Sequence, residues 1–170
     1  MTDVRNNIVA WAHWGVKNKA HFIYSEGPQR MSAIGVWPIR FPITADCSAT
    51  FTYWYWLGGA ADPNKLGYTH QGYTGTLLSA GKHIPIADVL PGDAVVYGPS
   101  TGWHVGIVVE VHGTDILTVS MGQNGDPSYV WVNAPKTVPA RGFAHDGRTP
   151  QTFLRFDTTQ VHAPKPIPSN

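Results

Sequence analysis

The chain has 170 residues, a formal net charge of +1 at pH 7 and a charged fraction of 14%, well below the roughly 25% of an average soluble protein. This length fits one domain with a single hydrophobic core, and the sparse, balanced charge excludes the electrostatic footprint of proteins that bind duplex nucleic acid or acidic membranes. Cys47 is the only cysteine, so an internal disulfide scaffold is excluded and the thiol is either a buried apolar group or a chemical one.

The N-terminal residues predict a helix rather than a targeting segment. Val4, Ile8 and Trp11 recur at helical spacing. They favour a helix over about residues 3–19 with one buried stripe. No basic head with an apolar run and a cleavage site is present, so we expect synthesis in the cytoplasm without a signal peptide. No stretch approaches the roughly 18 apolar residues that span a bilayer, so no membrane insertion is expected.

A long loop and a second helix follow. Residues 25–45 are rich in glycine and proline and predict a surface loop. Asp46 is a good N-cap, and the run that starts at Cys47 meets no helix breaker before Gly58 and Gly59. The β-branched and aromatic residues of this run would also suit a strand. The cap and the double glycine favour a helix that begins at Cys47.

The C-terminal half predicts a small antiparallel sheet. A loop over residues 60–73 and a short helix over residues 75–81 precede it. Residues 157–170 contain three prolines and no aromatic residue, which indicates a linker or frayed tail behind a domain of residues 1–156. About five strands are expected, over residues 94–97, 104–111, 116–121, 129–133 and 153–156.

Cys47 and His104 form a candidate nucleophile and base. Cys47 follows directly on a cap residue, so its thiol lies in the first helical turn, where free amides and the helix dipole favour the thiolate. His104 opens a strand, and Gly106 on the same face would let a helix approach closely. The alternatives are a small buried apolar cysteine and a strand-end histidine that faces water.

A cysteine–histidine pair usually needs a third polar group that holds the imidazole in the correct tautomer. If residues 113–115 form a three-residue hairpin loop, apolar side chains pair throughout and His104 lies opposite Asn124. A two-residue loop would bring Gln123 there, but would set three apolar residues of the next strand on the histidine face. We therefore predict Asn124 as the third residue, and Gln123 stays open as the alternative.

Other chemistries have little support in the sequence. There are eight histidines, but no His-x-x-x-His pair with an adjacent glutamate, and a lone cysteine does not make a structural zinc site. No Gly-x-Ser-x-Gly motif and no glycine-rich phosphate loop is present. We expect neither a metal nor a cofactor.

Three short motifs stand in order along the chain: Asp46-Cys47-Ser48 at the start of a helix, Pro91-Gly92-Asp93 before a strand, and His104-Val105-Gly106-Ile107 at the start of the next. They resemble the NlpC-type and CHAP-type papain-like cysteine peptidases of cell walls. Further motifs are Arg30-Met31, Ala60-Ala61-Asp62-Pro63, Gly72-Tyr73-Thr74-Gly75-Thr76-Leu77 and Leu154-Arg155-Phe156. With them the resemblance spans residues 20–156 and is strongest to the N-terminal peptidase domain of lysin A endolysins of phages that infect actinobacteria.

The resemblance implies an α+β papain-like NlpC-type fold, with the cysteine helix packed against the antiparallel sheet. It also implies a peptidoglycan hydrolase that cleaves an amide bond in the peptide stem or crossbridge. Cys47 would attack the carbonyl, His104 would act as base and then acid, and Asn124 would orient the imidazole. Backbone amides at the helix start would hold the oxyanion, with Tyr24 as a further donor.

The resemblance also implies that Asp46 and Ser48, which flank the nucleophile, contact the amine of the stem. Trp103, beside His104, and Gln123 are further residues predicted to bind substrate. As the third residue, bacterial relatives often have a histidine and phage relatives a glutamate in the region of residues 120–124, where Asn124 is predicted here. A neutral amide stabilises the imidazolium less than a carboxylate does.

The same resemblance implies a phage enzyme that is made in the host cytoplasm, leaves it by holin-type export and lyses the wall. We expect a monomer, which can be part of a longer multidomain lysin. The alternative is a non-catalytic wall-binding or virion structural module that keeps the fold. Aromatic residues make up 12% of the chain, more than a core of this size must hold, and this excess motivates the alternative. Its aromatic groove would use Trp37, Trp54, Trp56 and Trp103.

Overall fold

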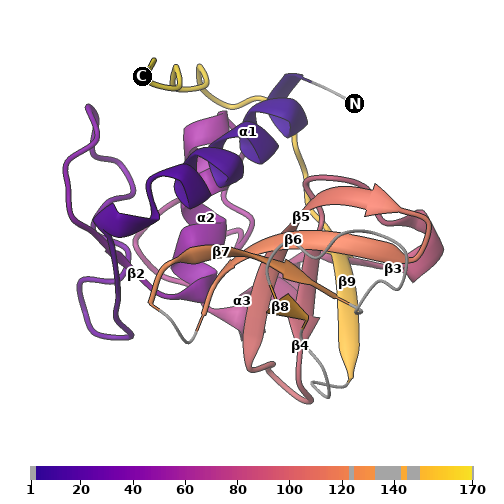
Figure 1. The fold of residues 1–170 in the computed structure, drawn as a ribbon. Coiled ribbons are helices and arrows are strands. Elements are labelled where there is room, and N and C mark those ends of the chain that lie inside the picture. The colour runs from indigo at the N-terminus through magenta and orange to yellow at the C-terminus, as the bar shows by residue number, and fades with distance from the viewer. Residues whose placement is uncertain (1–2, 123–124, 133–142, 145–149, 170) are drawn as a thin grey trace.

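The computed structural model describes residues 3–122, 125–132, 143–144 and 150–169, which form a helical layer and a sheet (Figure 1). None of the helices in these ranges is long and apolar enough to cross a membrane. The helices are α1 (Asp3–Lys17), α2 (Cys47–Gly58) and α3 (Thr74–Ala80), with 3-10 turns at Lys19–His21 and Ile86–Asp88. The strands are β1 (Phe22–Tyr24), β2 (Ile43–Ala45), β3 (Lys82–Ile84), β4 (Ala94–Tyr97), β5 (His104–His112), β6 (Asp115–Met121), β7 (Pro127–Trp131), β8 (Phe143–Ala144) and β9 (Gln151–Arg155).

α2 is the buried centre of the molecule. The Asp46 side chain accepts a hydrogen bond from the Ala49 N–H (2.9 Å), and Gly59 ends the helix in the left-handed conformation. Every α2 residue except Trp56 is buried. A helix that is apolar on all sides must be surrounded by protein, and α2 packs against both α1 and the strands β5 and β6. The prediction of a helix rather than a strand is confirmed.

Two glycines let α1 and α2 cross closely. A Cβ atom at Gly15 of α1 would lie 2.5 Å from the Trp54 ring. A Cβ atom at Gly58 of α2 would lie 2.5 Å from Ile8 Cγ1 and 3.1 Å from the Ile8 backbone nitrogen. Larger side chains would push the helices apart, so this contact depends on both glycines.

The main sheet has the strand order β3-β9-β4-β5-β6-β7-β8 and is antiparallel except for the β7–β8 pair. All five predicted strands are present, although β7 and β9 begin two residues earlier than expected. β3 and β8 extend the sheet at its two edges, and β1 and β2 form a separate parallel pair at the ends of the predicted loop. These additional strands have two or three residues each, too few for a visible alternation of apolar and polar side chains.

The predicted register of the β5–β6 hairpin is wrong. His112 pairs with Asp115, so the loop has two residues, not three. An irregularity between Val108 and Glu110 then shifts the register, and Ile107 pairs with Val119. The β-bulge restores the match of apolar faces that the three-residue loop was expected to supply. The proposed pairing partners of His104, residues 123 and 124, lie outside the described residues.

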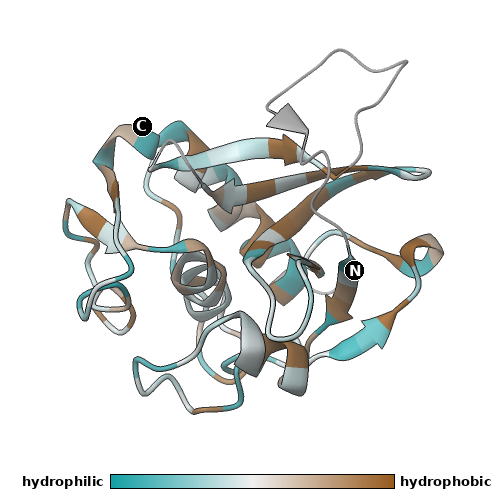
Figure 2. Ribbon diagram, turned by 90° about the horizontal axis from the view of Figure 1, so that it is seen from below, coloured by the Kyte–Doolittle hydropathy of each residue, from teal (hydrophilic) through white to brown (hydrophobic). Residues whose placement is uncertain are grey.

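The sheet buries apolar side chains on both faces. Val105 and Ile107 join the main core with α1 and α2, whereas Val95, Tyr97 and Val108 belong to a second cluster on the opposite face. Figure 2 shows hydrophobic segments along the strands that run past α2. β5 is therefore fixed from both sides, which holds the residues at its start rigidly in place.

The C-terminal residues lie against the helices (Figure 1). The Val161 N–H donates to the Gly59 carbonyl (2.9 Å), the Lys165 N–H donates to the Leu57 carbonyl (2.8 Å), and the Trp11 indole donates to the Lys165 carbonyl (3.2 Å). These bonds fasten the segment to both α1 and α2. The segment is docked on the helices, in contrast to a frayed end, which was one of its two predicted states; the other, a linker, stays a prediction.

Candidate active site

Cys47 lies at the first position of α2 and is buried. Burial, and to a lesser extent the charge of Asp46, raises the pKa of its thiol to about 11. Backbone N–H groups of Val105, Ser48 and Cys47 itself act in the opposite direction. The sequence predicted that the helix start would favour the thiolate; the amides do so, but burial outweighs them. A thiol with this pKa is neutral at pH 7 and needs a base to become a nucleophile.

His104 opens β5, the strand whose backbone meets this thiol. The backbone N–H of Val105 hydrogen-bonds to the Cys47 thiol, so the thiol meets the strand one residue beyond the histidine. His104 is 5% exposed, and its ring stacks on Tyr97 of β4 with a centroid distance of 6.0 Å. The alternative of a strand-end histidine that faces water is therefore wrong.

The expected role of Gly106 is also wrong. A Cβ atom there would meet the side chains of Thr118 (3.1 Å) and Ser120 (3.3 Å) on the neighbouring strand β6. The glycine makes room for strand side chains, not for a helix. α2 instead packs on the opposite face of β5, which carries Val105 and Ile107.

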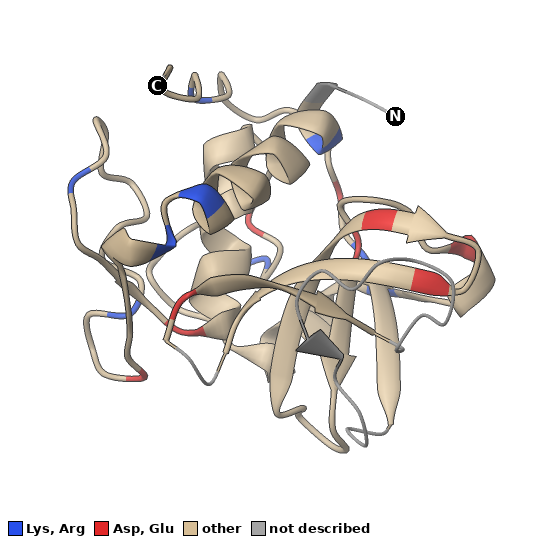
Figure 3. Ribbon diagram, in the orientation of Figure 1, with Lys and Arg blue, Asp and Glu red and all other residues tan. Residues whose placement is uncertain are grey.

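Asp46 and Ser48 lie beside the thiol but are engaged with each other and with the helix cap. Asp46 Oδ1 accepts hydrogen bonds from the Ala49 N–H (2.9 Å) and the Ser48 hydroxyl (3.2 Å). Asp46 Oδ2 lies 3.5 Å from Nε of Arg30, which also donates to the Gly72 carbonyl. α2 has no charged side chain along its length (Figure 3). Asp46, directly before Cys47, is therefore the charge nearest to it in sequence. Arg30 partly balances it.

Tyr24 lies close enough to Cys47 for the two groups to interact electrostatically. It pairs with Ala45 in the β1–β2 ladder, which puts it level with the residue before Asp46. Burial raises the pKa of Tyr24, and a hydrogen bond to Glu26 and the charges of Cys47 and Asp46 act in the same direction. The phenol therefore stays protonated, and it donates to Glu26 Oε1 (3.0 Å).

Trp103 forms an exposed aromatic rim beside His104. Its side chain is 62% exposed, and its ring lies against Gly98, where a Cβ atom would come within 2.5 Å. Tyr73, 49% exposed, lies on a neighbouring loop, because the Thr74 hydroxyl donates to the Gly102 carbonyl (3.4 Å). Tyr73 is the N-cap residue of α3. It stands in the motif of residues 72–77, but no site role was predicted for it.

The remaining tryptophans of the suggested aromatic groove serve other contacts. Trp54 is buried in the core under Gly15. Trp56 stacks on Tyr53 (centroid distance 6.2 Å, interplanar angle 9°), and the ammonium of Lys165 lies 5.3 Å from its ring centroid. An aromatic surface beside the candidate site therefore depends on Trp103 rather than on the tryptophans of α2.

Asn124 and Gln123 lie outside the described residues. The residues that flank them are described: the Gly125 N–H donates to the Gly122 carbonyl (2.9 Å). A Cβ atom at Gly125 would lie 3.6 Å from Cβ of Tyr24. Gly125 thus lies against Tyr24. In the described part of the chain, no group of three or more His, Cys, Asp and Glu side chains is placed to hold a metal ion.

Comparisons with known proteins agree with the fold. No protein-family model matches the sequence. No curated protein matches it either. A structure of RipA, the resuscitation promoting factor interacting protein, mutated at a histidine, superposes with a TM-score of 0.50 at 20% identity, over 92% of this chain and 65% of that one. This likeness confirms the predicted papain-like NlpC-type α+β fold.

Two further structures lie at slightly lower TM-scores. The peptidoglycan hydrolase RipB from Mycobacterium tuberculosis gives 0.48 at 22% identity, over 89% of this chain and 65% of that one. The P60 domain of an antigen from M. avium subspecies paratuberculosis gives 0.49 at 20% identity, over 90% of this chain and 93% of that one. The chain spans about two thirds of the RipA and RipB structures.

Proposed function

We propose that this protein is a cysteine-dependent peptidoglycan hydrolase that cleaves an amide bond in the peptide stem or crossbridge of the wall. The observation that carries the proposal is the meeting of two elements: the Cys47 thiol at the start of α2 contacts the β5 backbone at Val105, directly beside the buried His104. The description of RipB as a peptidoglycan hydrolase supports the choice of substrate.

The first half of the reaction forms an acyl-enzyme. Because the raised pKa keeps the Cys47 thiol neutral at pH 7, His104 must take its proton as the sulfur bonds to the carbonyl carbon. The carbonyl oxygen becomes an oxyanion, which N–H groups at the start of α2 stabilise. The Tyr24 hydroxyl joins them once its proton turns from Glu26 to the oxyanion. The tetrahedral intermediate collapses, the C–N bond breaks, and the leaving amine takes the proton from His104.

The second half returns the enzyme to its starting state. A water molecule gives its proton to His104 and adds to the thioester carbonyl. The C–S bond breaks, the new carboxyl group leaves, and the sulfur recovers its proton. Asn124 would hold the imidazole in the required tautomer, and Gln123 is the alternative. Asp46 and Ser48 would bind the amine of the stem, and Trp103 with Gln123 would hold the adjoining part of the substrate.

The motif resemblance supports a finer role as the peptidase domain of a phage endolysin. In that role the protein acts as a monomer or as part of a longer lysin. It is made in the host cytoplasm and reaches the wall after holin-type export.

The proposed function is tested on purified actinobacterial cell walls. Wild-type protein should release peptide fragments with new amino and carboxyl ends, identified by mass spectrometry. Cys47→Ala and His104→Ala should release none, while Lys82→Gln, on an exposed edge strand, should act like wild type. A chelator should have no effect. Equal release by Cys47→Ala would overturn the proposal, and inhibition by a chelator that zinc reverses would favour a metal-dependent enzyme.

A non-catalytic wall-binding module is the second candidate. The exposed Trp103 and Tyr73 and the raised pKa of the Cys47 thiol favour it. In this case wild type and Cys47→Ala would both sediment with cell walls and release nothing. Trp103→Ala would lower the bound fraction.

A further inference from the structure

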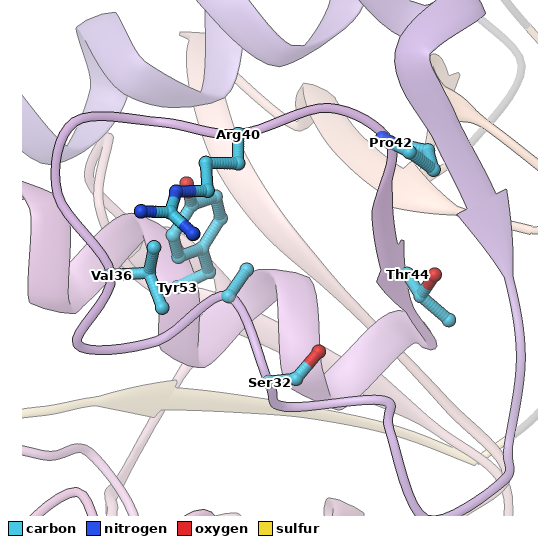
Figure 4. Close-up of a pocket in the computed structure, with 7 residues that line it drawn as sticks. Ser32, Val36, Arg40, Pro42, Thr44 and Tyr53 are labelled. Carbon is cyan, nitrogen blue, oxygen red and sulfur yellow. The ribbon is translucent and has the colours of Figure 1, made fainter.

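A pocket of about 210 Å³ lies between the β1–β2 loop and the side of α2 (Figure 4). Arg40 reaches into it from the loop (Figure 4). The buried Tyr53 of α2 and Thr44 of β2 line it from other sides. No acidic side chain lines the pocket. The residues labelled in the figure are Ser32, Val36, Arg40, Pro42, Thr44 and Tyr53.

Arg40 has no counter-charge among the residues that the structure describes. The loop of residues 25–42 has two arginines, and Arg30 is committed to Asp46 and the Gly72 carbonyl. Arg40 makes no hydrogen bond or ion pair with any residue that the structure describes. A planar guanidinium matches a carboxylate in a two-point geometry, so its preferred ligand is an anion of that shape.

Hydroxyl groups complete the polar lining. Burial raises the pKa of Tyr53, so its phenol stays a neutral donor. The Ser32 hydroxyl donates its proton to the Gln29 carbonyl (2.8 Å), so the hydroxyl donors left for a ligand are those of Tyr53 and Thr44. A cation with neutral hydroxyls and no acid suits one carboxylate group, and about 210 Å³ is below the roughly 300–1,000 Å³ of sites for drug-sized ligands.

The loop that carries Arg40 is held in place. Phe41 stacks on His21 (centroid distance 4.1 Å, interplanar angle 12°) and on Trp14 (6.1 Å, 16°). The Ile34 carbonyl lies 2.8 Å from Nε2 of His70. The pocket is therefore preformed, and a ligand does not have to order the loop when it binds.

The pocket lies close to the candidate nucleophile. Thr44 precedes Cys47 by three residues, so the two Cα atoms are at most about 11 Å apart along an extended chain. A peptide substrate covers this distance in about three residues. We propose that the Arg40 pocket is a subsite for a free carboxyl group of the peptide substrate, near the amide that Cys47 attacks. This inference rests on the proposed function.

The test uses pairs of synthetic stem peptides that differ only in whether one carboxyl group is free or a carboxamide. Wild type should prefer the free form in one pair. Arg40→Gln should raise KM for that peptide about tenfold with kcat nearly unchanged, because one charge-assisted contact is lost, and should leave the amide form unaffected. Lys82→Gln removes a charge elsewhere and should change neither. Thr44→Val should give a smaller rise in KM.

Two results would overturn the proposal: a rise of equal size for both members of every pair, or no effect of Arg40→Gln on any peptide. Arg40 is exposed and makes no bond within the described chain, so Arg40→Gln should keep the wild-type melting temperature. Calorimetric binding to Cys47→Ala separates the two proposals. If wild type cleaves no peptide, the proposed function fails, but the subsite can still be tested by binding. Weaker binding of the free carboxyl form by the Arg40→Gln, Cys47→Ala protein than by Cys47→Ala supports the subsite. Equal binding by the two proteins refutes it.

Discussion

At the scale of single residues, the protonation state of Cys47 depends on three opposing influences. Burial and the Asp46 carboxylate raise its pKa, and backbone N–H groups lower it. The balance leaves the thiol protonated in the folded protein over a wider pH range than in the unfolded chain. We make two predictions from this raised pKa of Cys47.

The first prediction concerns stability at alkaline pH. The folded-state pKa of Cys47 is about 11, raised from 9.0, so between these values the unfolded chain binds fewer protons than the folded one. Stability then falls as pH rises. We expect wild type to lose about 2–3 kcal/mol relative to Cys47→Ala between pH 9 and 11, and nothing below pH 8. Urea unfolding of both proteins from pH 7 to 11 measures this. Parallel curves would contradict it.

The second prediction distinguishes two roles of Asp46: its side chain caps α2, and its charge raises the pKa of Cys47. Asn is as good an N-cap as Asp, so Asp46→Asn should keep the stability of α2 while it removes a charge that raises the pKa of Cys47. The pH midpoint of iodoacetamide labelling should move down. Asp46→Ala should move the midpoint in the same direction and also lose about 1 kcal/mol of stability. An unchanged midpoint in both variants would show that the charge does not act on the thiol.

At the scale of elements, the crossing of α1 and α2 sets the position of the nucleophile. The two helices approach through Gly15 and Gly58. α2 then meets β5 on the face of Val105, which brings Cys47 to the strand. A larger distance between α1 and α2 would therefore displace the Cys47 thiol as well as the core side chains.

The third prediction follows from this contact. Gly58→Ala should lower the free energy of unfolding by about 1–3 kcal/mol, because its Cβ atom would lie 2.5 Å from Ile8 Cγ1 and 3.1 Å from a backbone atom that cannot yield. The gain in helix propensity only partly offsets this. Gly122→Ala, where a Cβ atom would meet no described residue within 4 Å, is the control. Chemical denaturation of both variants measures the difference; equal stabilities would show that the helices can move apart freely.

At the scale of the whole molecule, the C-terminal tail ties the helices together. It bonds to Trp11 of α1, to Leu57 of α2 and to Gly59 behind α2. The ammonium of Lys165 lies over the rings of Trp37 (5.7 Å) and Trp56 (5.3 Å). The tail thus connects the β1–β2 loop, which carries Arg40, with the helical layer.

The fourth prediction is that the tail contributes to stability. A chain that ends at Asp157 should lose about 1–2 kcal/mol through the lost hydrogen bonds and cation–π contacts. Lys165→Met should account for part of this loss. Melting temperatures of the three proteins check it. Identical values would mean that the tail only rests on the surface, as a linker would.

Features that depend on a few neighbouring residues were predictable. The Asp46 cap, the end of α2 at Gly59 and the strand over residues 104–111 follow from local backbone preferences, and the motif resemblance correctly implied the fold class. The predicted three-residue hairpin loop is wrong: the hairpin has a two-residue loop and a β-bulge near Val109. Both arrangements place apolar residues opposite one another, so they satisfy the same apolar pattern. The pattern alone does not distinguish them.

The sequence by itself determined where a nucleophile and a base could lie: a cysteine behind a cap and a histidine at the start of a strand. Only the tertiary structure decided that the Val105 backbone meets the thiol, that burial outweighs the helix amides, and that Arg40 faces a pocket. The physical reason is range. Caps and turns are set by contacts within a few residues, whereas burial, pKa values and pockets are set by segments that are distant in sequence and meet only when the chain has folded.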